Sequence, residues 1–247
     1  MQPIPLAVVA ALDDEIRIVL SKMEVDSRAH VKPSLFTKGS VGGKSLIVVR
    51  SGIGTAAMES AASYLFSQFS PAFCLHVGYC GGAEPKDAPG DLLIAETVVD
   101  ARSGERIEVG PGLAERAEAV ARERELRARR GTLVTVDKVV ESPHEKAFAG
   151  TQHAAAGIDM ESAALAIACR ERGIPWLVVR AVLDPLDVAL PDMGDAVTEE
   201  GATDGVALAE HLVKNPKDIL SLPRLQYFAG QARNSITEFV EGWIEKT

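Results

Sequence analysis

Residues 158–184 read IDMESAALAIACRERGIPWLVVRAVLD, and their pattern indicates the fold class most clearly. Its first part has a helical pattern over residues 160–172, and Gly173 and Pro175 then favour the end of that helix. Residues 176–182 form a short, continuous apolar run, which is typical of a strand buried on both faces of a sheet. The segment therefore predicts a helix that leads directly into a central strand.

The same alternation continues toward the N-terminus. Further β-rich apolar runs occur at residues 6–11, 45–49, 72–77, 92–98 and 132–136. Helical patterns lie between them at residues 14–22, 55–69 and 113–129. Strands that alternate with helices predict crossover units around a largely parallel sheet in an α/β fold.

The C-terminal part of the chain has a different pattern. After Asp184 the strand runs stop, and helices are predicted at residues 197–214 and 216–243, which gives a helical tail over about 197–247. The second helix carries apolar residues at intervals close to three and four, from Leu222 to Trp243. Such a stripe favours packing against the core or another subunit, and contact with a lipid-like ligand is the alternative.

Length and charge limit the classes of function. A chain of 247 residues that is 47% hydrophobic can bury one sizeable core, so we expect a single domain over residues 1–247. The formal net charge of -9 gives no basic surface for phosphate backbones. The one basic cluster, residues 122–130, is interrupted by Glu123 and Glu125, as on a solvated helix face. Nucleic acid is therefore not an expected partner.

The cysteines and the N-terminus indicate a cytoplasmic protein. Cys74, Cys80 and Cys169 form no C-x-x-C pair and have no histidine at metal-ligand spacing, so we expect buried, reduced thiols and no metal. The apolar residues 3–12 lack a basic region before them and run into Asp13, unlike a cleaved signal peptide. Apolar runs stay below the roughly 18 residues of a membrane span.

Candidate ligand groups follow the predicted strands, because ligands of open α/β sheets gather beyond the carboxyl ends of the strands. These groups are Asp13-Asp14-Glu15, Ser51-Gly52-Ile53-Gly54, Gly78-Tyr79-Cys80-Gly81-Gly82, Asp159-Met160-Glu161-Ser162, and Asp184. The glycine-rich loop at 78–82 predicts backbone N–H groups that hold an anion or a sugar hydroxyl, or else a structural turn.

A dinucleotide-binding site is one alternative for the second group. Gly52, Gly54 and Ala57 match G-x-G-x-x-A between a strand and a helix. The supporting acid should stand about 20 residues later, at the end of the next strand, where the chain has residues Leu75, His76 and Val77. The pattern therefore disfavours a nicotinamide or flavin enzyme.

Two separated acids, Glu161 and Asp184, suit the cleavage of a glycosidic bond. That reaction builds positive charge on the ribose and negative charge on the departing base. A carboxylate near the hydroxyls stabilises the first charge, and a carboxylic acid near the base supplies a proton to the second. Each acid also has a structural alternative: Glu161 suits the first turn of a helix, and Asp184 suits a turn before Pro185.

The blocks at 51–54, 78–82, 158–164 and 179–184 resemble, in order and spacing, the signature blocks of the nucleoside phosphorylase and nucleosidase superfamily. The resemblance covers residues 6–187. It implies a three-layer α/β/α sandwich around a largely parallel mixed sheet, a purine nucleoside as small-molecule substrate, and a homo-oligomer. It also implies that Glu161 bonds the ribose hydroxyls, that Met160 packs on the sugar, and that Asp184 protonates purine N7. Ser51, Gly52, Tyr79, Cys80 and Gly81 are the remaining candidates for substrate binding in these blocks.

The resemblance gives mixed indications about the acceptor. Glu15 aligns with the acid that activates water in methylthioadenosine and adenosylhomocysteine nucleosidases. His76 stands where bacterial purine nucleoside phosphorylases keep a phosphate-binding arginine. Cys80 resembles the phosphorylase version of the glycine loop, and Tyr79 departs from the small hydroxyl residue usual in both groups.

A narrower resemblance favours phosphorolysis. A similarity to the hopanoid-associated phosphorylases covers Val139 and Val140 before Pro143 and Lys146, residues 183–191, and the tail. They imply cleavage of a 5′-modified adenosine such as adenosylhopane, with phosphate as co-substrate and no cofactor. The alternatives are a methylthioadenosine-type nucleosidase, a general purine nucleoside phosphorylase and a nucleoside-binding protein without activity. Retention of both Glu161 and Asp184 disfavours the last, because binding alone needs no general acid.

Overall fold

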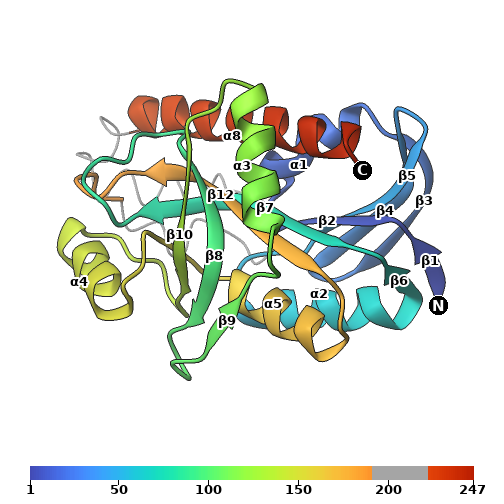
Figure 1. Ribbon diagram of the computed structural model, residues 1–247, viewed down its shortest axis with the longest axis horizontal. Helices are drawn as coiled ribbons and strands as arrows, with labels where there is room; N and C mark the ends of the chain where they lie inside the picture. Colours follow the sequence, from blue (N-terminus) through green and yellow to red (C-terminus); the bar gives the residue numbers. More distant parts are fainter. Residues whose placement is uncertain (191–221) are drawn as a thin grey trace, which may run out of the picture.

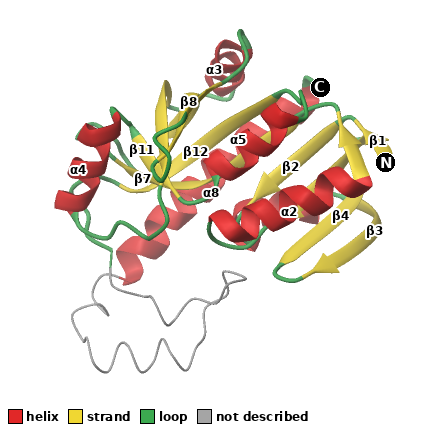
Figure 2. Cartoon of the chain, turned by 90° about the horizontal axis from the view of Figure 1, so that it is seen from below, coloured by secondary structure: helices red, strands yellow, loops and turns green. Residues whose placement is uncertain are grey.

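The computed structural model describes residues 1–190 and 222–247 and contains three layers (Figure 1). One face of a mixed sheet is covered by α1 (Asp13–Ser21), α3 (Leu113–Glu123) and α8 (Leu222–Glu245). The opposite face is covered by α2 (Thr55–Gln68) and α5 (Ser162–Glu171), which pack side by side (Figure 2). A further helix, α4 (Pro143–His153), lies at one end of the molecule. The predicted three-layer α/β/α sandwich is thus confirmed.

The main sheet has the strand order β11-β10-β8-β12-β7-β2-β5-β4-β3, with β9 beside β8. Its strands are β2 (Leu6–Ala10), β3 (Glu24–Val31), β4 (Ser34–Val41), β5 (Lys44–Arg50), β7 (Cys74–Gly82), β8 (Leu92–Asp100), β9 (Arg106–Glu108), β10 (Ala128–Thr135), β11 (Gly157–Asp159) and β12 (Trp176–Asp184). A separate two-stranded sheet pairs β1 (Gln2–Ile4) with β6 (Phe69–Pro71).

Strand direction brings several strand ends to one edge. β7 is parallel to both β2 and β12, so the carboxyl ends of these three strands lie together. β11 pairs antiparallel with β7 as well as parallel with β10. This second pairing closes β7, β12, β8, β10 and β11 into a ring and places Asp159 beside the same edge.

The core follows from strands that are apolar on both faces. Alternate side chains of a strand point to opposite faces. Val8, Val77 and Val179 accordingly pack under α1, α3 and α8, whereas Val9 and Val178 pack against α2 and α5. Every residue of β2 is buried, as the continuous apolar run 6–11 predicts.

The predicted helix at 113–129 is too long. α3 ends at Glu123, Glu125 has a left-handed φ of 56°, and β10 begins at Ala128. Parallel pairing of β10 with β8 outweighs the helical spacing of the charges, because the ladder satisfies the backbone hydrogen bonds of this segment. The arginines at 127–130 therefore do not form the expected solvated helix face, and Arg129 pairs with Asp87 instead.

The apolar stripe of the tail packs against the core over the described part of the helix. Its buried residues in α8 include Phe228, Ala232, Ile236, Phe239 and Trp243. The predicted helix at 197–214 and the start of the next at 216–221 lie outside the described residues. Across residues 1–190 and 222–247, no helix has both the length and the apolar character that crossing a bilayer requires.

Candidate active site

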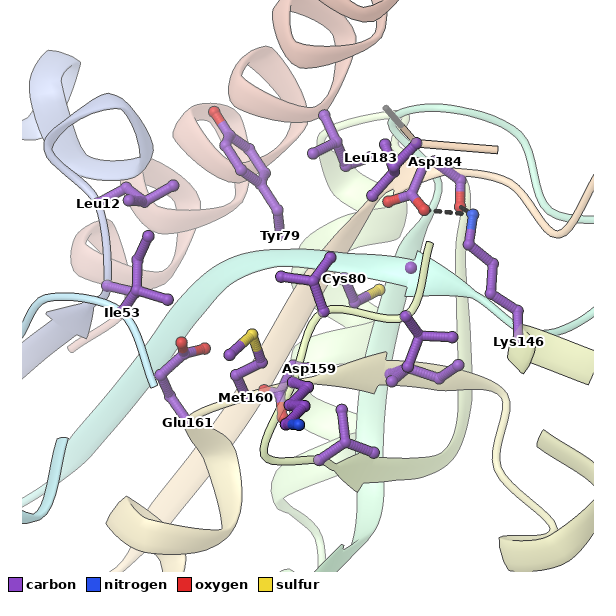
Figure 3. A pocket seen from close by; sticks show the side chains of 18 of the residues that line it. Leu12, Ile53, Tyr79, Cys80, Lys146, Asp159, Met160, Glu161, Leu183 and Asp184 are labelled. Atoms are coloured by element: carbon purple, nitrogen blue, oxygen red, sulfur yellow. Dashed lines mark hydrogen bonds and ion pairs between the residues drawn. The ribbon is translucent and has the colours of Figure 1, made fainter. Parts of the chain in front are cut away.

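A pocket of about 220 Å³ lies at the carboxyl ends of β2, β7, β11 and β12. Most of the predicted site residues line it: Glu15, Tyr79, Cys80, Gly81, Val139, Val140, Met160, Glu161 and Asp184. In Figure 3, Met160 and Cys80 lie between Glu161 and Asp184. The structure therefore brings together side chains that are up to 169 positions apart, from 15 to 184.

Ser51 and Gly52 are placed beside the pocket and do not line it. Ser51 is fully buried, and its hydroxyl donates to the Gly52 carbonyl at 2.8 Å. Gly52 has a φ of 89°, a conformation that favours glycine. The turn that they form presents Ile53 to the pocket and directs the Gly54 N–H to the Glu161 carboxylate at 2.7 Å.

Glu15 is an anchored carboxylate. It lies in the first turn of α1, where the helix dipole favours an acid. Its Oε2 accepts from the backbone N–H groups of Ala11 at 2.9 Å and Leu12 at 2.8 Å, and its Oε1 accepts from Tyr79 N–H at 2.8 Å. Burial raises the pKa of Glu15, while nearby Arg180 and these N–H groups oppose the rise.

Arg180 of β12 is a central residue of the site, although it lies outside the predicted set. Its guanidinium donates to Asp159 at 2.8 Å, to the Ser162 hydroxyl at 2.9 Å and to His76 Nε2 at 3.0 Å. It also lies 3.9 Å from Glu161. A Cβ added to Gly78 would stand 2.0 Å from Arg180 Nη1, so glycine is needed for this approach.

Glu161 precedes α5 and lies close to several charged groups. Burial, together with the nearby Asp159, raises the pKa of Glu161 to about 7, and Arg180 opposes the rise. The Gly54 N–H holds one carboxylate oxygen. Thr55 donates from its hydroxyl to the Met160 carbonyl at 3.0 Å, which fixes the turn that carries Met160 and Glu161.

Asp184 lies at the end of β12 and contacts the ammonium group of Lys146 (Figure 3). Burial raises the pKa of Asp184 to about 6 against the opposing effect of Lys146. Lys146 comes from α4 and also lies outside the predicted set. In the sequence, Lys146 is part of the hopanoid-type resemblance, which gives it no role. Its position after a helix start, Ser142-Pro143, by itself predicts a surface lysine.

Tyr79 and Cys80 present neutral groups. The Tyr79 hydroxyl donates to Asp14 at 2.7 Å, and Asp14 accepts from Arg233 of α8 at 2.8 Å. Burial raises the pKa of both Tyr79 and Cys80. Neither side chain therefore brings a charge to the pocket near neutral pH.

Apolar side chains form much of the remaining wall. Leu12 and Ile53 line the side near Glu161, and Leu183 lines the side near Asp184 (Figure 3). Val140 lines the pocket as predicted, and so does Val139, although its side chain is more than half exposed. The pocket thus combines acids at separate places, among them Glu161 and Asp184, with a largely apolar surface. This combination suits an organic ligand that has polar groups at more than one place.

Relatives of the chain include enzymes that cleave nucleosides. It is 29% identical over 195 residues to the 5′-methylthioadenosine/S-adenosylhomocysteine nucleosidase of Geobacillus kaustophilus, with 72% of this chain and 83% of the relative covered. The nucleosidase of the same name from Bacillus velezensis is 27% identical over 227 residues, with 85% and 98% covered.

Solved structures share the fold. The 5′-methylthioadenosine/S-adenosylhomocysteine nucleosidase of Colwellia psychrerythraea, in complex with adenine, superposes with a TM-score of 0.74 at 19% identity, covering 99% of this chain and 96% of that chain. Futalosine hydrolase of Helicobacter pylori gives a TM-score of 0.71 at 22% identity, with 97% of each chain covered. The family model described as the phosphorylase superfamily matches residues 5–215. With most of its length matched by that model, the chain belongs to the phosphorylase superfamily.

Proposed function

We propose that the protein hydrolyses the N-glycosidic bond of an adenine nucleoside with an apolar 5′ substituent. The observation that carries this proposal is the position of Glu15. Three backbone N–H groups hold its carboxylate at the pocket wall, at 2.8–2.9 Å. A buried base in that place suits activation of a water molecule.

In this mechanism the acids act on different parts of the substrate. Glu161 accepts hydrogen bonds from the ribose hydroxyls and stabilises the positive charge that develops on the sugar. Asp184 gives its proton to N7 of the base as the electron pair of the glycosidic bond moves to the ring. Glu15 takes a proton from water as the oxygen attacks the anomeric carbon. Free base and free sugar are the products.

The charges of the pocket support water in preference to phosphate. Among the described residues, the acids that line it are Glu15, Asp159, Glu161 and Asp184, and the basic side chains are Lys138 and Lys146. A phosphate dianion near Glu15 and Glu161 would meet like charges in a poorly solvated place. His76, which stands where the phosphorylase resemblance needs an arginine, is buried with a lowered pKa, because desolvation and Arg180 both disfavour its cation.

The relatives support the same choice, since the enzymes from Geobacillus kaustophilus and Bacillus velezensis are named as nucleosidases of 5′-methylthioadenosine and S-adenosylhomocysteine. We therefore favour hydrolysis over the phosphorolysis that the hopanoid-type resemblance suggests. Leu12, Ile53 and Val140 give the pocket an apolar wall that suits an alkylthio or larger apolar group. Adenosylhopane as the substrate stays a prediction.

Adenine release from a panel of 5′-substituted adenosines, with and without phosphate, tests the proposal. Glu15→Gln should lower release by at least about 100-fold, because the amide cannot take the proton from water. Glu24→Gln, on the exposed strand β3, serves as the matched control and should keep the parent rate. The first sugar product should be the free sugar, even with phosphate in excess. Detection of a sugar 1-phosphate, or phosphate-dependent release by Glu15→Gln, would contradict hydrolysis.

A further inference from the structure

Lys146 has an unusual position for a lysine, because its side chain is fully buried. The start of α4 fixes this position. Ser142 accepts from Glu145 N–H at 3.2 Å, and the Glu145 carboxylate accepts from Ser142 N–H at 3.0 Å, so the two residues form a capping box. Lys146 follows directly in the first turn, where the helix dipole disfavours a cation.

The buried ammonium group has acceptors from one segment of the chain. It donates to the carbonyls of Val188 at 2.6 Å and Pro185 at 3.2 Å, and it forms an ion pair with Oδ2 of Asp184. A buried cation requires partners of this kind to offset its desolvation. The carbonyl contacts hold the segment after β12 against α4, which is a structural role. The contact with the carboxylate has a second role, because Asp184 is the residue that protonates the base in the proposed function.

We propose that Lys146 is a positioning residue that sets the proton-donating strength of Asp184. This proposal rests on the proposed function. The ammonium group holds Oδ2, so the proton that is given to the base resides on Oδ1. When the glycosidic bond breaks, that proton moves to the ring nitrogen, and the carboxylate left behind is stabilised by Lys146, which keeps its own protons. Without the lysine, Asp184 would be a weaker acid toward the same base.

The other titratable groups near Asp184 do not duplicate this effect. The Cys80 thiol of β7 is kept neutral by burial, which raises its pKa. Lys138 lines the same pocket from the segment between β10 and α4, but its side chain is exposed to solvent. Asp159 and Glu161 lie beside Arg180. Among residues 1–190 and 222–247, the charge that contacts the Asp184 carboxylate directly is that of Lys146.

Two substitutions separate the charge from the structural contacts. Lys146→Gln keeps N–H donors for the Pro185 and Val188 carbonyls but has no charge, and Lys146→Met keeps the length of the chain without donors or charge. Lys44→Met is the control, because Lys44 also donates to carbonyls, those of Ile244 and Glu245 at the end of α8. Folding of each variant is checked by thermal unfolding.

The first measurement does not depend on activity. The carboxyl ¹³C resonance of Asp184, assigned by its loss in Asp184→Asn, is titrated in the parent and in the variants. In both Lys146 variants its pKa should rise by at least about one unit, because an opposite charge in contact lowers the pKa of a carboxyl by that amount or more. The Lys44→Met titration should match the parent.

The second measurement compares two leaving groups. Adenine needs a proton to depart, whereas 4-nitrophenolate departs as a stable anion. At pH 5, where Asp184 is protonated in both proteins, release of adenine from 5′-methylthioadenosine should fall by about tenfold in Lys146→Gln, because the acid is weaker. Release of 4-nitrophenolate from its riboside should fall by less than about threefold at the same pH. The alkaline limb of kcat/KM for adenine release should also move to higher pH.

An unchanged Asp184 titration in both variants would overturn the proposal. So would an equal loss for the two leaving groups, or a loss confined to Lys146→Met, because either result marks a purely structural lysine. Failure of the parent protein to release adenine from the whole panel would instead count against the proposed hydrolysis. The ¹³C titration would still decide the effect of Lys146 on Asp184 in that case.

Discussion

Glu161 is buried close to Asp159, and its ionised form therefore destabilises the folded protein. Its pKa is raised to about 7 in the folded protein, above the 4.5 of an unperturbed glutamate, mainly by burial and next by Asp159. The folded state therefore binds a proton between these two values that the unfolded state has already released. The contribution of Glu161 to stability must consequently fall as pH rises from about 4.5 to 7, and this loss is complete above pH 7.

Replacing Glu161 by glutamine removes this pH dependence. Glu161→Gln should be more stable than the parent at pH 8, by on the order of 2 kcal/mol, and the difference should shrink toward zero at pH 4.5. Urea unfolding of both proteins across this range measures it. The variant should also lose turnover, since a neutral amide cannot stabilise the charge on the ribose. A stability difference that is flat with pH would show that Glu161 is not the group that titrates.

From the sequence, site residues that directly follow a strand can be predicted, whereas site residues inside a strand or a helix are missed. Glu15 and Asp184 are predictable because a carboxylate after a buried apolar strand lies at the edge where ligands gather. Glu161 follows β11, a three-residue strand that gives no apolar run of its own, and the family resemblance singles it out. Arg180 stands inside an apolar strand, and a charge there is itself a sign of buried partners. Lys146 is harder to find, since its burial depends on how the segment after β12 lies against α4.

Among the elements, α8 is tied to the site as well as to the core. Phe239 and Trp243 are fully buried, and their rings stack with centroids 6.0 Å apart. Through Arg233, α8 also holds Asp14, which holds the Tyr79 hydroxyl at the pocket. The helix thus contributes apolar burial to the fold and one polar contact to the residues around Glu15.

Truncating the apolar stripe of α8 should be costly. Phe239→Ala is expected to lower the free energy of unfolding by about 3–5 kcal/mol, because it leaves a cavity between α8 and the sheet. Gln226→Ala, on the exposed side of the same helix, should change it by less than about 0.5 kcal/mol. Denaturant titration of the two variants measures both free energies of unfolding and shows whether α8 is part of the core or a peripheral helix. Similar values for both would contradict the core role.

Some strands and helices are predicted correctly from the sequence pattern and others are not. The apolar strand runs are confirmed because burial on both faces leaves a simple signature in the sequence. β3 and β4 are not predicted, since β3 is largely exposed and its composition is mixed. The predicted run 132–136 matches the second half of β10, but residues 128–129 at its start are wrongly assigned to a helix. The charges at 127–130 fit both a helix and a strand, and the pairing of β10 with β8 joins segments that are distant in the sequence.

For the whole molecule, the central feature is β7, which pairs with β12, β2 and β11. Its residues 74–78 are fully buried, between the two helical layers. By contrast, α4 lies at one end, with Phe148 63% exposed. The strands β7 and β12, which present Tyr79, Cys80 and Asp184, are therefore enclosed by other elements. The helix α4, which presents Lys146, has a largely exposed surface.

This difference has a consequence for amide hydrogen exchange. Amides at the centre of β7 and β12 should exchange with deuterium only when the whole protein unfolds, whereas those of α4 should exchange through local opening, at least about 100-fold faster. Mass spectrometry of peptides from the two regions would measure the ratio, and equal protection would contradict it. Opening of α4 would separate Lys146 from Asp184 while the strands stay folded, so the protein would pass through short-lived states whose sheet is native and whose acid has lost its cationic partner.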